Sequence, residues 1–196
     1  MSDMVARGRY AKGVAKREEI LQVALEVVAE VGYRKASNRE IAYRVGLTQP
    51  GLMHYFSSRE ELYMEVLRAK DDRDLGRFME PDQTFEGFLA VIANNTTVPG
   101  LVRLFVEFSA EATIAGHPAN SYFVEHYARA RRLLLDVIAR EQASGSLGAT
   151  LDAEIAVDLI IAASDGLQVQ WLLDPGVDMV ERLSRLWNGI RLASLR

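Results

Sequence analysis

The sequence contains no cysteine, and this absence excludes disulfide bonds and thiolate metal sites. It also fits a reducing compartment, so we expect a cytoplasmic protein. Only five prolines occur among 196 residues, and strand-like alternation of apolar and polar residues is scarce, so the composition predicts an all-α fold. We find no apolar run of membrane-spanning length and no apolar signal core near the N-terminus, and therefore expect no membrane contact.

The sequence also lacks the arrangements that mark an enzyme or a metalloprotein. It contains no Gly-rich phosphate loop, no zinc motif and no Ser, His and Asp grouping typical of nucleophilic catalysis. His117, Glu125 and His126 are the best metal candidates, but adjacent helical positions such as the last two point in different directions. We therefore expect no catalytic residue, no metal and no cofactor.

Charge is distributed unevenly along the chain. Residues 1–59 hold ten Lys and Arg against six Asp and Glu, whereas residues 60–196 hold thirteen against twenty-one. Chance clustering is one explanation, but a basic first third on an acidic body also suits a head that binds phosphate. In residues 1–16 the basic side chains alternate with Gly and Ala, which predicts a flexible basic arm that either becomes ordered on DNA or is a solvated tail.

Residues 37–56 have the pattern of two short helices joined by a tight corner. Ser37 and Glu40 form a capping box for the first helix, and Thr48 can cap the second. Gly46 can take the left-handed conformation that the corner needs, because it has no Cβ. This is the pattern of a DNA-binding helix-turn-helix, although other all-helical proteins also contain two capped helices joined at a glycine.

The polar face left over on this motif provides the candidate DNA contacts. Gln49 can pair with an adenine edge, Arg39 can reach a guanine, and Thr48 can bond phosphate or base. Pro50 and Gly51 have little bulk, so the backbone of the second helix can lie close to the groove.

Three segments then occur in a specific order without a gap over residues 17–66: REEILQVALEVVAEVGY, REIAYRVGLTQPGL and HYFSSREEL. This run resembles the DNA-binding domain of the TetR (tetracycline repressor) family of transcriptional regulators. The resemblance implies base contacts from Arg39, Gln49, Pro50 and Gly51. It implies phosphate contacts from Tyr55 and Arg59. Met53 stands where the family usually has tyrosine, which leaves open whether His54 takes over that contact or is only a surface histidine.

The rest of the chain predicts a helical body. We expect helices at residues 16–31 and 58–78 on either side of the motif, and five more at residues 82–97, 99–116, 119–144, 152–173 and 177–195. The charged segment KDDRD interrupts the apolar pattern and places a domain boundary nearby. The predicted organisation is a flexible basic arm (1–16), a helix-turn-helix DNA-binding domain (17–66) and a helical ligand-binding and dimerisation domain (67–196).

Aromatic residues are more frequent on the body helices than a small bundle needs. With polar neighbours they are typical of a small-molecule cavity, although core packing explains each aromatic residue equally well. The expectation of a pocket comes mainly from the family resemblance. Its candidate lining residues are Phe88, Phe105, Phe108, Tyr122, His126, Gln168 and Trp171.

The last two expected helices carry apolar stripes with small residues in the middle. Antiparallel helices of this kind pack closely on a partner, and in the family the two C-terminal helices of each subunit form a four-helix dimer interface. The alternative is that the stripes face the subunit's own core. The candidate interface residues are Leu159, Gly166, Val169, Leu173, Leu183, Leu186, Trp187 and Ile190.

These features together predict a homodimeric, sequence-specific DNA-binding transcriptional regulator. We expect a repressor that a small-molecule effector releases from a palindromic operator in double-stranded DNA. The alternative class is an all-α small-molecule carrier, or an enzyme, that no longer binds DNA. Such a protein would have no use for the basic residues and the capped turn.

Overall fold

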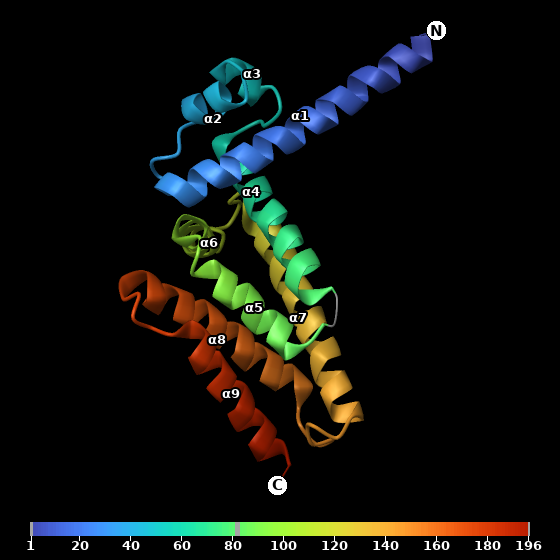
Figure 1. The fold of residues 1–196 in the computed structure, drawn as a ribbon, viewed down its shortest axis with the longest axis vertical. Coiled ribbons are helices and arrows are strands. Elements are labelled where there is room, and N and C mark those ends of the chain that lie inside the picture. The colour runs from blue at the N-terminus through green and yellow to red at the C-terminus, as the bar shows by residue number, and fades with distance from the viewer. Residues whose placement is uncertain (1, 81–82, 196) are drawn as a thin grey trace.

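The computed structural model describes residues 2–80 and 83–195, and every regular element in this part of the chain is helical, which confirms the predicted fold class. The head contains α1 (Ser2–Val31), α2 (Asn38–Arg44) and α3 (Gln49–Met53). From it α4 (Arg59–Asp74) descends into a body of five helices: α5 (Phe85–Asn95), α6 (Pro99–Glu111), α7 (Asn120–Ala143), α8 (Ala153–Leu173) and α9 (Met179–Ser194). The head and the α8–α9 pair lie at opposite ends of the molecule (Figure 1).

The predicted corner between α2 and α3 is confirmed. Ser37 Oγ accepts a hydrogen bond from the Glu40 amide at 3.1 Å, and Thr48 Oγ1 accepts one from the Gly51 amide at 3.2 Å. Gly46 lies between the two helices at φ +66°, where an L side chain would be strained. These local interactions orient α3 relative to α2.

Two predicted boundaries differ from the structure. The backbone of residues 2–15 continues α1 in place of an irregular arm, because Ala, Arg and Lys favour helix even without a buried face. The side chains of residues 2–11 lie outside the described part of the structure, so a DNA-binding role for this segment stays a prediction.

The second difference concerns the domain boundary expected near KDDRD, because this segment lies inside α4, within the helix expected at residues 58–78. Lys70 and Asp74 lie one helical turn apart and form an ion pair at 2.6 Å, so these charges support the helix. After Asp74 the chain adds a π-helical turn, η1 (Leu75–Met79), before it reaches α5. The division of the chain near residue 67 therefore falls inside one continuous helix.

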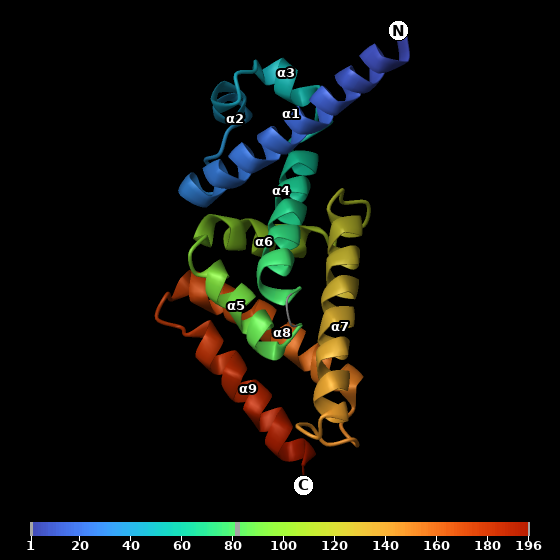
Figure 2. The same cartoon turned by 45° about the vertical axis from the view of Figure 1, so that its right-hand side comes forward.

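The head rests on the body through α1, α4 and α6 (Figure 2). A single cluster of buried side chains runs from α1 through the helix-turn-helix to α4, α6 and the start of α7. Two further clusters fill the body between α5, α7, α8 and α9, and between α5, α6, α8 and α9. The core is thus continuous between the motif and the first helices of the body.

Contact between α1 and α6 depends on the small size of Gly100. A Cβ at this position would lie 2.1 Å from the Val28 carbonyl oxygen, far inside van der Waals contact. A second contact joins the head to α6. Arg34 donates two hydrogen bonds to Glu107 Oε2, at 2.9 and 2.6 Å, and Tyr33 donates another to the same oxygen. One carboxylate on α6 therefore binds two neighbouring residues of the head.

Gly100→Ala should destabilise the protein by about 1–3 kcal/mol, because the added methyl group must push α6 away from α1. Gly13→Ala in α1 is the control, since nothing lies within 4 Å of the added Cβ and alanine favours helix. Urea unfolding of both variants checks the prediction. An equal midpoint for Gly100→Ala and the wild type would show that α1 and α6 are not in close contact.

Candidate nucleic-acid interface and ligand cavity

The candidate base-reading residues lie on the exposed side of α2 and α3. The side chains of Arg39, Thr48, Gln49 and His54 are exposed, and the structure shows no hydrogen bond from Arg39 or Gln49 to another described residue. Their donors and acceptors are therefore available to a partner. Pro50 is also exposed, whereas Gly51 and Tyr55 are half-buried.

Arg59 has a structural role that the sequence reasoning missed. Its Nη2 donates to the carbonyl oxygens of Tyr33 at 2.7 Å and Ala36 at 2.9 Å, and its Nε donates to Tyr63 Oη at 3.1 Å. Tyr63, which is buried, donates to the same Ala36 oxygen at 2.8 Å. These bonds satisfy carbonyl groups of the loop between α1 and α2. The predicted phosphate contact of Arg59 is untested, but most of this guanidinium already serves the fold.

The Met53 side chain is half-buried, so the surface of α3 at this position differs from that of a helix with tyrosine there. Asn38 Nδ2 lies 3.2 Å from Met53 Sδ, while buried Asn38 Oδ1 has no hydrogen-bond partner among the described residues. His54 is exposed beside Tyr55, with 6.0 Å between ring centroids. A DNA contact from His54 stays a prediction.

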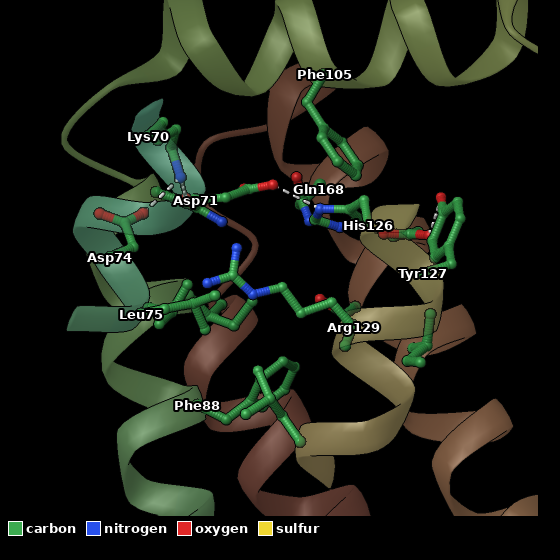
Figure 3. Close-up of a pocket in the computed structure, with 18 of the residues that line it drawn as sticks. Lys70, Asp71, Asp74, Leu75, Phe88, Phe105, His126, Tyr127, Arg129 and Gln168 are labelled. Atoms are coloured by element: carbon green, nitrogen blue, oxygen red, sulfur yellow. Dashed lines mark hydrogen bonds and ion pairs between the residues drawn. The ribbon is translucent and has the colours of Figure 1, made fainter. Parts of the chain in front are cut away.

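A cavity of about 130 Å³ lies in the body between α4, α5, α6, α7 and α8 (Figure 3). Four of the seven predicted lining residues surround it: Phe88, Phe105, His126 and Gln168.

The other three predicted lining residues lie elsewhere, and core packing explains them. Phe108 packs edge-on against Tyr33 at 5.7 Å in the head-side core, and Trp171 belongs to the buried cluster under α9. Tyr122 is buried behind the cavity wall, where its hydroxyl donates to Asp71 at 2.8 Å. Each is an aromatic residue on a helix of the correct region, but none of the three lines the cavity.

Charged residues of α4 form one wall of the cavity, and sequence reasoning missed them because KDDRD looked like a boundary. Lys70 Nζ binds Asp74 Oδ2 at 2.6 Å and donates to Asn95 Oδ1 at 2.7 Å. His126 Nδ1 lies 2.7 Å from Asp71 Oδ2. Burial alone would raise the pKa of Asp71, but its bonds with His126 and Tyr122 and the charge of Lys70 outweigh burial and lower it. Asp71 is therefore held as a carboxylate.

The opposite wall, formed by α7 and α8, contains a second carboxylate in a different state. Tyr127 donates a hydrogen bond to Asp165 Oδ2 at 2.7 Å. Burial raises the pKa of Asp165, and the bond from Tyr127 offsets only part of this effect. Ser164 and Gln168 are each only 6% exposed, and the structure shows no side-chain hydrogen bond from either to another described residue. Both residues line the cavity.

The predicted dimer interface divides into an exposed and a buried half. Leu183 is fully buried, and Trp187 stacks on Phe85 at 4.2 Å between ring centroids. Leu186 and Ile190 are half-buried against the same core. These four residues face the subunit's own core, because α9 has a single apolar face and packs it against α5 and α8.

The exposed half is the apolar stripe of α8, and its role as a dimer interface stays a prediction. Its exposed residues recur at helical spacing, with two small residues in the middle: Ile155, Leu159, Ala162, Gly166, Val169 and Leu173. Leu192 of α9 and Leu195, directly after this helix, are also exposed.

The length and composition of α8 also satisfy the criteria for a membrane span, with a mean hydropathy of 1.3. This differs from the expectation that the chain contains no apolar run of membrane-spanning length. The bent pair α5–α6, at 103°, satisfies them jointly. Core helices and interface helices of other proteins satisfy the same criteria, and α8 carries Asp158 and Asp165 within its length.

An exposed recognition helix, joined by one continuous helix to a body with a mainly apolar cavity that several charged residues line, defines a ligand-binding helix-turn-helix regulator. Residues 20–66 match the family described as bacterial regulatory proteins, tetR family, and residues 85–188 match the BetI-type transcriptional repressor C-terminal domain. The chain belongs to the TetR family of DNA-binding transcriptional regulators, which are not enzymes.

Characterised relatives agree with this assignment. The transcriptional repressor KstR2 of Rhodococcus jostii is 24% identical over 196 residues, covering 92% of this chain and 91% of the relative. A TetR-family regulator from a Rhodococcus species has the same fold, with a TM-score of 0.69 at 20% identity over 91% of this chain and 98% of its own. A regulator from Saccharomonospora viridis, in complex with choline, has a TM-score of 0.67 at 21% identity over 89% and 94% of the two chains.

Arg59→Ala should lower the free energy of unfolding by about 1–3 kcal/mol, because two loop carbonyl groups lose the guanidinium donor and must share the one hydroxyl of Tyr63. Thermal unfolding checks this, with Arg39→Ala as the control for loss of an exposed guanidinium. If Arg59→Ala unfolds like the wild type but flattens the salt dependence of DNA binding, the residue acts mainly on phosphate.

Proposed function

We propose that this protein is a repressor in which Arg39 and Gln49 read bases in the major groove and a small molecule in the body cavity releases the DNA. A two-fold dimer would place the two copies of α3 in successive major grooves, about 34–36 Å apart. We place the protein in the cytoplasm, where chromosomal DNA and metabolites are both accessible.

The observation that carries this proposal is that two helices contact both the cavity and the head. The first is α4, in which Arg59 and Tyr63 hold the head while Lys70 and Asp71 line the cavity. The second is α6, in which Phe105 lines the cavity and Glu107 binds Tyr33 and Arg34.

A ligand that favours one arrangement of α4 and α6 must therefore also favour one placement of the head. It changes the DNA affinity only by as much as its own affinity differs between the DNA-binding and released states. The order of these contacts along two rigid helices supports such coupling without a separate hinge.

The size and lining of the cavity support a small organic effector. An engineered protein cavity of about 150 Å³ holds benzene, so about 130 Å³ accepts a ligand of similar size without rearrangement. Small ligands occur in this fold, as in the choline complex of the Saccharomonospora regulator.

We propose that the exposed stripe of α8 is the centre of the dimer interface. Leu173 is 83% exposed and Leu159 54% exposed in the single subunit, and a contiguous apolar surface of this kind marks an interaction site. Gly166 lies at its middle, where a small residue allows the backbones of two helices to approach closely. This arrangement leaves the two heads free to bind DNA at the other end.

Gln49→Ala should weaken operator binding by about 1–3 kcal/mol, because the amide that pairs with a base edge is lost. Binding to random DNA should change little, since the phosphate contacts remain. The operator is first identified by selecting genomic fragments that the protein binds. Fluorescence anisotropy then measures the affinity for operator and for random DNA, and gives the ratio of the two. Equal losses on the two would remove Gln49 from base reading.

Gly166→Arg should convert the dimer into a monomer that is still folded. Nothing lies within 4 Å of a Cβ added at Gly166, so the single subunit tolerates the change, whereas a guanidinium would separate two packed α8 helices. Light scattering measures the mass and circular dichroism the fold, with Ala110→Arg on exposed α6 surface as the control. A dimer that persists in Gly166→Arg would place the interface elsewhere.

A further inference from the structure

Tyr43 is an exposed aromatic residue on α2, close to the proposed base-reading residues in the sequence. Its side chain is 80% exposed, and its hydroxyl group forms no hydrogen bond with another described residue. All other tyrosine, phenylalanine and tryptophan side chains that the structure describes are buried or half-buried. A ring with a free hydroxyl group suits a contact with a partner, because tyrosine offers both apolar area and a hydrogen-bond donor.

Helical geometry divides the exposed side of α2 into two stripes. Arg39 and Tyr43 lie one turn apart and form the first stripe, and Glu40 and Arg44 form the second in the same way. All four side chains are exposed, whereas the remaining side of α2 packs against the core.

The second stripe is already occupied by ion pairs. Arg44 donates a hydrogen bond to Glu40 at 2.8 Å and another to Glu30 of α1 at 3.0 Å. Two carboxylates surround one guanidinium group, so this stripe has a net negative charge. It would repel a phosphate group and attracts no DNA backbone.

The first stripe lies on the side of α2 that borders α3. The Asn38 amide lies 3.2 Å from Met53 Sδ, which marks the edge along which the two helices meet. A helix turns by about 100° per residue, so Arg39 and Tyr43 lie between this edge and the second stripe. In Figures 1 and 2, α2 and α3 lie on the side of α1 away from the body, which leaves this surface open to a partner.

The position of Tyr43 suits a contact with the DNA backbone. Side chains on a helix tilt toward its N-terminus, so the Tyr43 ring leans toward Arg39. In helix-turn-helix proteins bound to DNA, the first helix crosses the sugar–phosphate backbone while the second enters the major groove. A residue one turn behind a base-reading arginine therefore meets the phosphates at the edge of the groove, and tyrosine hydroxyl groups are among the donors that bind them.

We propose that the Tyr43 hydroxyl group donates a hydrogen bond to a DNA phosphate oxygen beside the base pair that Arg39 reads. The contact fixes the position of α2 on the backbone without adding a positive charge. This inference rests on the proposed base reading by Arg39 and adds a residue to the DNA interface.

Tyr43→Phe removes only the hydroxyl group, from a side chain too exposed for the change to affect folding. We expect an affinity about three- to tenfold lower on operator and random DNA alike, because a phosphate contact carries no sequence information. The dependence of affinity on salt should keep the wild-type slope, since a neutral hydroxyl group releases no counterion. Fluorescence anisotropy at several salt concentrations measures all three quantities.

Ser144→Ala is the control, because it removes an exposed hydroxyl group after α7, at the end of the molecule away from the head (Figure 1). It should bind both DNAs like the wild type. Wild-type affinity in Tyr43→Phe, a loss confined to the operator or a changed salt slope would each overturn the proposal.

Single methylphosphonate substitutions along the operator identify the phosphate, because each replaces one phosphate oxygen with a methyl group. We expect one position to weaken the wild type clearly and Tyr43→Phe only slightly, whereas the other contacted phosphates should affect both proteins equally. If every position affects the two proteins equally, Tyr43 does not bind the backbone.

A second dimer on the same DNA is the alternative partner for an exposed ring. In that case the loss in Tyr43→Phe would appear only on DNA that binds more than one dimer, which the stoichiometry of the titration shows, and the phosphate contact would be refuted.

Arg39→Ala separates this inference from the proposed function. An unchanged ratio of operator to random affinity in Arg39→Ala would refute base reading by Arg39, while a uniform loss in Tyr43→Phe would still support the phosphate contact.

Discussion

The hydrogen bonds that Arg59 and Tyr63 make to the Tyr33 and Ala36 carbonyl groups are the constraint on which the architecture depends. They attach the loop before the helix-turn-helix to the first turns of α4. Because α4 is one unbroken helix to Asp74, the same element that holds the head also forms the charged wall of the cavity. The position of the recognition helix and the shape of the cavity are therefore linked through a rigid body.

The acidic residues on the two sides of that cavity differ in the partners that they bind. On α4 each acidic group has a partner close by, and these pairs stabilise the helix where it passes through the interior. On α8 the half-buried carboxylate of Asp165 accepts a hydrogen bond from Tyr127 and has no ion-pair partner among the described residues.

Most of the helices and their starts could be predicted from the sequence because the signals are local. Caps at Ser37 and Thr48 and the turn at Gly46 involve residues within three or four positions of each other. The stripe of α8 was also correctly predicted, since its spacing alone identifies one face. The cavity was only half predicted: Phe105 and Gln168 line it, but Lys70 and Asp71 became recognisable as lining only when α4 was placed beside α7 and α8.

Sequence alone determined the class of fold, the helix-turn-helix and the family, because periodicity, capping and a short ordered motif are properties of neighbouring residues. Tertiary structure decided which neighbouring element each apolar face packs against and which groups each polar side chain binds. Trp187 packs on Phe85 instead of a partner subunit, and Arg59 binds carbonyl groups from a distant loop. Such choices depend on contacts between residues tens of positions apart, and an apolar stripe or a basic side chain looks the same in the sequence whichever contact it makes.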